Sequence, residues 1–183
     1  LSDFTSGKSI MLTGTFANGF TGNSDVIQRA FNGIDGIVGG QSQNDSLTGL
    51  DQNATWELDG SNTYTSNGGQ VLSFEGVEQL TGGLADDTFL IQGTRSNDLF
   101  GGAGNDTFRF TQAFSQLVGS IVGDAGTDTI DMSQFTTQRN VILTGSAGGG
   151  FSGTEASITA AFSGIDSVIG GFTSNNDNLF GID

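Results

Sequence analysis

The chain of 183 residues carries 20 acidic and 5 basic side chains, a formal net charge of −15, and it contains 31 glycines but no proline, cysteine or histidine. So few cations exclude proteins that bind nucleic acid or anionic membranes through Lys and Arg, and no apolar run reaches the ~20 residues that a membrane-spanning helix needs. Helix formers are scarce, turn formers are abundant, and 15 phenylalanines are more than a disordered segment carries, so an all-β fold of short strands and tight turns is predicted.

The beginning of the chain, up to Gly40, returns near the end of the chain in the same order. Among the matches are Ser2–Thr5 with Ser133–Thr136, Leu12–Gly14 with Leu143–Gly145, and Phe31–Asp35 with Phe162–Asp166. All matches share one offset in the numbering, 131, and 17 of the 39 aligned positions are identical. The sequence therefore predicts one continuous domain over residues 1–183, in which 1–131 form a full period and 132–183 begin the next. We expect the pattern to continue beyond both ends.

A shorter beat of about 20 residues runs through the middle of the chain. The glycine-rich loops at 82–87, 101–106 and 123–128 follow one another at offsets of 19 and 22. This is the length of one coil of a β-solenoid, in which each coil buries its apolar residues against its neighbours. The predicted fold is a right-handed parallel β-helix, or β-solenoid, of roughly eight such coils.

A strand is predicted directly after each of these loops, at 88–91, 107–110 and 129–132. Apolar residues alternate with others in all three, so one face of the sheet receives Phe89 and Ile91, Phe108 and Phe110, and Ile130 and Met132. We expect these pairs to stack as inward-facing ladders. The single Trp56 and the single Tyr64 are interpreted as packing residues and not as a platform for sugars.

The stretch Gly101–Arg109 follows the pattern G-G-x-G-x-D-x-U-x, where U is a large apolar residue. Here the sequence resembles the RTX, or haemolysin-type calcium-binding, repeats. The resemblance implies a β-roll-like region around 82–132, with calcium between stacked turns, held by carboxylates and glycine carbonyls. The metal-site residues predicted from it are Asp87, Asp98, Gly101, Gly102, Gly104, Asn105, Asp106, Asp124, Gly126 and Asp128. The alternative is that these aspartates only cap backbone amides at turns. For two further aspartates in glycine-containing loops, Asp45 and Asp177, this capping role is the favoured interpretation.

Over its whole length the chain is similar to the long repeats of giant bacterial surface proteins, the filamentous-haemagglutinin-like and RTX adhesins. The likeness is carried by Thr55–Leu58, Phe74–Gly83 and Asp86–Phe89. It implies an extracellular or cell-surface repeat that acts as a stalk, fibre or spacer and is not an enzyme. Its expected partners are neighbouring repeats, stacked head to tail, and unidentified surface or matrix ligands. Neither nucleic acid nor membrane insertion is expected.

Three other functions fit parts of the sequence. One is a calcium-dependent folding and secretion module of the RTX type, which would couple metal binding to folding. Another is a β-helix enzyme that acts on polysaccharides, for which carboxylates such as Glu75 and Asp86 are available. The third is an ice-binding solenoid, suggested by the Thr-x-Thr pairs at 63–65 and 127–129, although these pairs do not recur from coil to coil.

Overall fold

The computed structural model describes residues 6–27, 30–40, 44–147, 149–171 and 176–181. These residues form strands, turns and bends and no helix, so the all-β prediction is confirmed. The strands belong to two sheets in which most pairs are parallel. The repeated phrase Ser2–Thr5 lies outside the described residues. Within the described ranges, no helix is long and apolar enough to cross a membrane.

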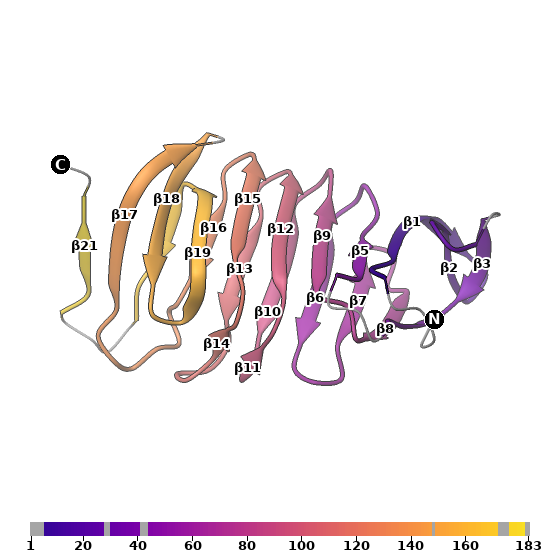
Figure 1. The fold of residues 1–183 in the computed structure, drawn as a ribbon, viewed down its shortest axis with the longest axis horizontal. Coiled ribbons are helices and arrows are strands. Elements are labelled where there is room, and N and C mark those ends of the chain that lie inside the picture. Colours follow the sequence, from indigo (N-terminus) through magenta and orange to yellow (C-terminus); the bar gives the residue numbers. More distant parts are fainter. Residues whose placement is uncertain (1–5, 28–29, 41–43, 148, 172–175, 182–183) are drawn as a thin grey trace.

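The larger sheet has 13 strands, and 11 of them lie side by side along the long axis of the molecule (Figure 1). Their spatial order is β21 (Asn178–Phe180), β17 (Asn140–Ala147), β18 (Gly150–Glu155), β19 (Ile158–Ile165), β15 (Ile121–Ala125), β12 (Asp98–Ala103), β9 (Gln79–Gly83), β5 (Ser46–Thr48), β1 (Ser9–Phe16), β2 (Gly19–Ser24) and β3 (Phe31–Ile34). Two short strands lie beside this row: β11 (Thr94–Arg95) pairs with β14 (Gln116–Leu117), and β14 also pairs with β19.

The smaller sheet packs against the larger one and has eight strands. Their spatial order is β20 (Ser167–Ile169), β16 (Thr129–Asp131), β13 (Thr107–Phe110), β10 (Asp87–Ile91), β6 (Ala54–Leu58), β7 (Thr63–Ser66), β8 (Val71–Glu75) and β4 (Gly36–Val38). The core lies between the two sheets, where Phe20 of β2 meets Tyr64 of β7 at a ring distance of 5.6 Å.

From β9 to β16 the chain alternates regularly between the sheets. In the larger sheet β9, β12 and β15 pair in parallel, with Leu80 opposite Leu99 and Leu99 opposite Ile121. In the smaller sheet β10, β13 and β16 do the same. In this part of the chain the strands recur with the short period of the sequence, about 20 residues.

Three other segments do not follow this beat, because each forms a three-stranded antiparallel meander within one sheet: β1–β2–β3, β6–β7–β8 and β17–β18–β19. The connections explain the difference from a uniform parallel coil. Residues 17–18 join β1 to β2, and residues 156–157 join β18 to β19. A two-residue connection can only return the chain antiparallel to itself, because a parallel neighbour needs a long crossover.

The inward-facing ladders predicted for β10, β13 and β16 are confirmed. Phe89 pairs with Phe108, and Phe108 pairs with Ile130. The rings of Phe89 and Phe108 stack with centroids 5.1 Å apart, and Trp56 continues the stack at 5.6 Å from Phe89. All four side chains are buried, and each stabilises the fold by roughly 2–3 kcal/mol through removal of apolar surface from water. Trp56 and Tyr64 are fully buried, as packing residues are.

The two copies of the repeated sequence form the same meander in the same register. Leu12 lies opposite Gly22 in the first copy, Leu143 opposite Gly153 in the second, and the register shifts directly after each pair. In the larger sheet, seven strands from β3 to β15 precede β19, the counterpart of β3. In the smaller sheet, seven strands from β4 to β16 precede β20, the counterpart of β4. Each full period of the sequence therefore adds seven described strands to the row of each sheet, and in the larger sheet β11 and β14 lie beside that row.

Candidate functional site

Three buried aspartates form a row at the entrance to neighbouring strands of the smaller sheet. This aspartate row consists of Asp87, Asp106 and Asp128. The amide of Asp87 donates a hydrogen bond to Oδ1 of Asp106 at 2.7 Å, and the amide of Asp106 donates to Oδ1 of Asp128 at 2.8 Å. The amide of Asp128 donates in turn to Oδ2 of Asp166, at 2.9 Å. The carboxylates of Asp106, Asp128 and Asp166 thus each cap the amide of the preceding position in the stack.

The first glycine of each loop makes room for the aspartate that ends it. A Cβ placed on Gly101 would overlap Oδ2 of Asp106, and a Cβ on Gly82 or Gly123 would overlap Oδ2 of Asp87 or Asp128. No side chain larger than hydrogen fits beneath these carboxylates. The spacing from glycine to aspartate in the G-G-x-G-x-D pattern therefore has a packing reason that does not involve a metal.

The row contains carboxylate oxygens with no hydrogen bond. Both oxygens of Asp87 and the Oδ2 atoms of Asp106 and Asp128 are buried without a hydrogen bond of good geometry, although the backbone of Ala54 lies near enough to Asp87 to lower its pKa slightly against the effect of burial. Burial raises the pKa of Asp87 to about 8, and the neighbouring charge of Asp106 contributes to the rise. Burial raises the pKa of Asp106 to about 7 and also lifts the pKa of Asp128. Since an unsatisfied buried carboxylate is costly, these oxygens favour a bound proton or a bound cation.

A second row lies beside the first on the exposed side of the loops. The amide of Asn105 donates to Oδ1 of Asp86 at 2.7 Å, and the amide of Thr127 donates to Oδ1 of Asn105 at 2.9 Å. Here each side chain caps an amide of the following loop, whereas in the aspartate row each acceptor caps an amide of the preceding loop. The two rows therefore connect the same stacked loops by hydrogen bonds of opposite direction. Asn105 was predicted as a metal-site residue, and the structure gives it this capping contact.

The remaining predicted site residues are only partly brought together. Gly102 and Asp124 occupy the same position in consecutive loops, with positive φ angles of 99° and 69°, so aspartate replaces glycine where a left-handed backbone is required. Gly104 and Gly126 follow two residues later, and a Cβ on Gly126 would meet the Gly104 carbonyl oxygen. Asp98 lies apart from the row, at the start of β12, where its Oδ1 accepts hydrogen bonds from the amide and hydroxyl of Ser120 at 2.9 and 2.7 Å.

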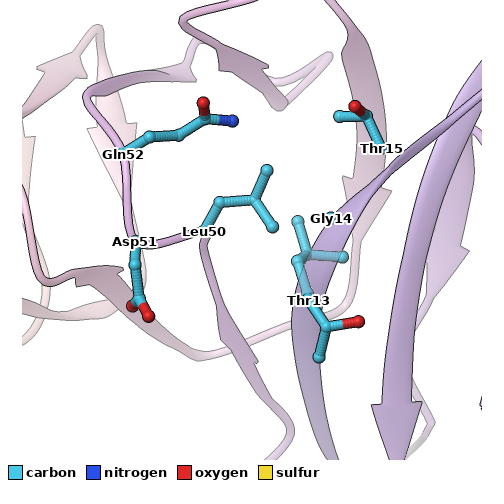
Figure 2. Close-up of a pocket in the computed structure, with 7 residues that line it drawn as sticks. Thr13, Gly14, Thr15, Leu50, Asp51 and Gln52 are labelled. Carbon is cyan, nitrogen blue, oxygen red and sulfur yellow. The ribbon is translucent and has the colours of Figure 1, made fainter.

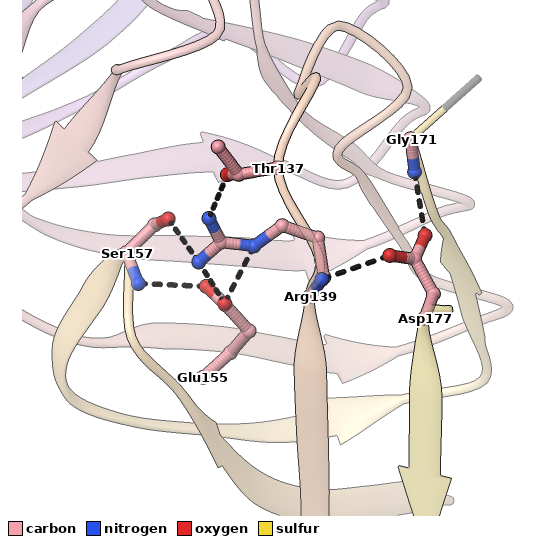
Figure 3. Close-up of polar contacts among 6 residues, drawn as sticks. All are labelled: Thr137, Arg139, Glu155, Ser157, Gly171 and Asp177. Atoms are coloured by element: carbon pink, nitrogen blue, oxygen red, sulfur yellow. Dashed lines mark hydrogen bonds and ion pairs between the residues drawn. The ribbon is translucent and has the colours of Figure 1, made fainter. Parts of the chain in front are cut away.

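Asp45 and Asp177 cap turns, as favoured from the sequence. Oδ1 of Asp45 accepts the amide of Lys8 at 2.7 Å, and its Oδ2 accepts the amide of Gly40 at 2.5 Å. Asp177 repeats the arrangement with the amides of Arg139 and Gly171, at 2.8 and 2.9 Å (Figure 3). In these longer loops both carboxylate oxygens accept amide hydrogens, which the three carboxylates of the aspartate row do not.

A buried ion pair, which was not predicted from the sequence, joins Arg139 to Glu155 (Figure 3). The Arg139 Nε atom donates to Oε1 of Glu155 at 2.9 Å, and Nη2 donates both to the same oxygen and to the Ser157 hydroxyl. The guanidinium carbon lies 4.4 Å from the centre of the Phe135 ring. In the first copy the positions of Arg139 and Glu155 are Lys8 and Ser24, so only knowledge of the fold could have revealed the pair.

Some of the surface hollows contain carboxylates. One lies between β1 and the segment after β5, lined by Leu12–Thr15 and Leu50–Gln52, and Asp51 is its one carboxylate (Figure 2). Another contains Glu78 and Asp98. Oε2 of Glu78 accepts the amide of Asp45 at 3.1 Å, and Asp98 is held by Ser120. These last two carboxylates therefore act as caps on neighbouring turns.

A calcium ion at the aspartate row would draw on few carboxylates. Among the described residues, no three acidic side chains gather where they could hold one metal ion. Calcium takes six to eight oxygen ligands, so carbonyl oxygens of the glycine loops would have to supply most of them. The orphaned oxygens of Asp87, Asp106 and Asp128 fit such a role, whereas Asp98 does not share their position.

Comparison of the chain with protein-family models, curated proteins and solved structures finds no match in any of the three.

Proposed function

We propose that the chain is a structural repeat of a large secreted or cell-surface bacterial protein, stacked as a right-handed parallel β-solenoid that serves as a stalk, fibre or spacer in adhesion. The observation that carries the proposal is the period: the span 1–131 adds seven strands to the row of each sheet, and the next copy starts in the same register. A chain built in this way lengthens without limit as copies are added.

The charge distribution supports a role as an extended scaffold. The net charge of −15 keeps a long stack of sheets soluble and discourages lateral association. Acidic side chains such as Asp45, Glu78, Asp98 and Asp177 cap backbone amides from position to position along the stack. Polar residues are thus used to hold neighbouring loops in register, which is the demand placed on a spacer.

The test is the length of chains that contain one, two and three periods. With strands about 4.8 Å apart, seven strands per period predict an increase of about 34 Å for each added period. Small-angle scattering and negative-stain microscopy measure this increment directly. A maximum dimension that grows much less than this, or a compact radius of gyration, would refute the proposal. Protease treatment of intact cells, which digests only displayed protein, tests the surface location separately.

A second candidate is an RTX-type module that folds when it binds calcium outside the cell. The observation that favours it is the set of partnerless buried oxygens on Asp87, Asp106 and Asp128. If calcium binds there, the far-UV circular dichroism melt moves to a higher temperature in millimolar Ca²⁺ than in EDTA, and not in Mg²⁺. The Asp106→Asn variant must lose that shift. Coincident melts in EDTA and Ca²⁺ would leave the aspartates as turn-capping residues.

A further inference from the structure

One end of the larger sheet extends beyond the smaller sheet. The smaller sheet ends at β20, the counterpart of β4, whereas the larger sheet continues past β19 with β18, β17 and β21 (Figure 1). In the first copy, the counterparts β2, β1 and β5 are covered by the β6–β7–β8 meander, as the ring contact between Phe20 and Tyr64 shows. We call the corresponding inner surface of β17, β18 and β21 the uncovered face; its exposed or partly exposed apolar residues are Leu143, Phe151 and Leu179, while Val141 beside them is buried.

Equivalent residues in the two copies differ in exposure in the manner this overhang predicts. Phe20 is 0% exposed, but its counterpart Phe151 is 46% exposed. Leu47 is 0% exposed, but its counterpart Leu179 is 67% exposed. The backbone register around each pair is the same in both copies, so the side chains point to the same side. The difference is therefore due to the missing cover.

Glycine environments and a hollow locate the missing cover more closely. A Cβ on Gly49 would lie 2.9 Å from the Tyr64 ring and 3.0 Å from the Trp56 ring, whereas its counterpart Gly181 has nothing within 4 Å. A hollow lined in part by Val141, Val168 and Leu179 opens at the uncovered face. Val168 is the counterpart of Ile37, and in the first copy Ile37 of β4 lies opposite Phe74 of β8. The vacant positions are therefore those of Trp56, Tyr64 and Phe74.

We propose that the uncovered face binds a polypeptide segment with the sequence of residues 52–83, as the next copy of the repeat would provide. Its antiparallel meander would cover Phe151 and Leu179 with the side chains that correspond to Tyr64 and Trp56. Its last strand would pair with the free edge of β21, as β9 pairs with β5 through Leu80 and Leu47. The inference rests on the proposed repeat architecture and identifies the partner of its free end.

A second folded copy of the chain does not fit this face. In a folded copy, Trp56 and Tyr64 are themselves fully buried against β2 and β5, so the meander cannot be offered to another molecule. The opposite end of the stack has a different vacancy: Ile27 is 45% exposed, whereas its counterpart Ile158 is 3% exposed because it pairs with Leu117 of β14. The exposed surfaces at the two ends therefore fit different segments, and the end of one molecule does not fit the opposite end of another.

The test is a titration of the full chain into a fluorescently labelled synthetic peptide of residues 52–83, followed by anisotropy. Saturable one-to-one binding is expected. Phe151→Asp and Leu179→Asp should each weaken it by at least tenfold, or about 1.4 kcal/mol. The matched control is Ile142→Asp, because Ile142 points outward and is exposed in both copies, as its counterpart Met11 is. This control should change the affinity less than twofold.

A second measurement uses the same segment in cis. Asp183 aligns with Asp51, so residues 52–83 appended after Asp183 continue the repeat in phase. The extended chain should melt at a higher temperature, and Phe151→Asp should remove the gain.

Lack of peptide binding together with no gain in cis would overturn the inference, and so would equal effects of Ile142→Asp and Phe151→Asp. Self-association of the chain that Phe151→Asp abolishes, without peptide binding, would assign the face to a second copy instead. A rod that lengthens by the expected increment, with neither peptide binding nor a gain in cis, would leave the proposed function standing and remove only this inference.

Discussion

Glycine and aspartate act as a unit in the loops that precede β10, β13 and β16. In all three loops the aspartate carboxylate lies over the glycine Cα and needs a glycine beneath it, and the carboxylates of Asp106 and Asp128 also accept an amide hydrogen from the preceding loop. The motif that resembles a calcium-binding repeat is therefore also the smallest sequence that lets a carboxylate connect two stacked loops.

Replacement of Gly101 by alanine should destabilise the chain by about 2 kcal/mol or more, because the new methyl group meets both Oδ2 of Asp106 and the carbonyl oxygen of Gly123. Gly145→Ala is the matched control within a strand. A Cβ there meets nothing within 4 Å, so the change should stay within roughly 1 kcal/mol of the original chain or stabilise it. Urea unfolding of the two variants measures the difference. Equal free energies of unfolding would contradict the packing explanation.

The aspartate row should make the protein more stable at mildly acidic pH than at pH 8. The folded state holds protons on Asp87 and Asp106 with pKa values of about 8 and about 7, while an aspartate in the unfolded chain has a pKa of about 3.9. This contribution to stability is complete below pH ~4 and is lost as the pH rises through 7 to 8. The melting temperature should therefore fall steadily between pH 5 and pH 8.

Asp106→Asn separates this effect from the general relief of negative charge. Asparagine keeps an oxygen that accepts the amide of Asp87 but cannot ionise. The variant should be more stable than the original chain at pH 8 by at least ~1 kcal/mol and should lose part of the fall in melting temperature. The exposed Asp51→Asn serves as a control with the same change of charge. If both substitutions alter the pH profile equally, burial of the row is not the cause.

Among the strands and turns, the second copy differs from the first in how its meander is fastened. Arg139 and Glu155 tie the start of β17 to the turn between β18 and β19, whereas the first copy has Lys8 and Ser24 at those positions. Because both side chains of the pair are buried, removal of one leaves an uncompensated charge in the interior.

Glu155→Ser, which installs the residue of the first copy, should cost about 3 kcal/mol or more by stranding the guanidinium. The triple change R139K/E155S/S157V recreates the first-copy set Lys8, Ser24 and Val26. It should recover much of the loss, because a lysine can extend its ammonium group to solvent. Denaturant titrations of the single and triple variants compare the two states. If the triple variant is no more stable than Glu155→Ser, the uncompensated charge of Arg139 is not the main cause of the lost stability.

The elements that sequence reasoning predicted well are those whose spacing alone fixes them. Phe89 and Phe108 lie at the same place in consecutive periods of about 20 residues, follow identical Asp-Thr steps and alternate with other residues, so their parallel stacking could be predicted from the pattern. The antiparallel meanders could not be predicted in this way, because the alternation of residues in β1 and β2 is the same whether the chain returns antiparallel or crosses to the other sheet. The turn at Ala17 decides between these, and its positive φ of 50° is not encoded by a glycine.

The candidate site was predictable only in part, for a similar reason. The row of Asp87, Asp106 and Asp128 follows from their equal places after the glycine loops. Asp98 was grouped with them because it lies between Asp87 and Asp106 in the sequence, but it begins a strand of the other sheet. Whether a carboxylate caps an amide or binds a cation depends on sub-ångström placement of its second oxygen, which residue spacing does not specify.

For the whole molecule, the order of strands in space differs from their order in the chain. β4 lies at the end of the smaller sheet and pairs with β8, which follows β5, β6 and β7 in the sequence. β2 is likewise covered by Tyr64 of the later β7. The first four strands therefore cannot complete their contacts until the meander at 54–75 has formed. Coils that stack in sequence order would open one at a time from the ends, but this arrangement ties distant segments together.

We therefore expect β1–β8 to open as one cooperative unit. In hydrogen exchange followed by mass spectrometry, the paired amides of β4 and β8 should exchange at the same rate as those of β5 and β6 across a denaturant series. The mutation Tyr64→Ala, which removes the ring that covers Phe20, should raise the exchange rate of β1 and β2 together with that of β7 and leave β13 and β16 unchanged. Fraying of β3 and β4 well before β5–β8, with no response to Tyr64→Ala, would mean that the stack opens coil by coil from its end and that the crossed strand order adds no cooperativity.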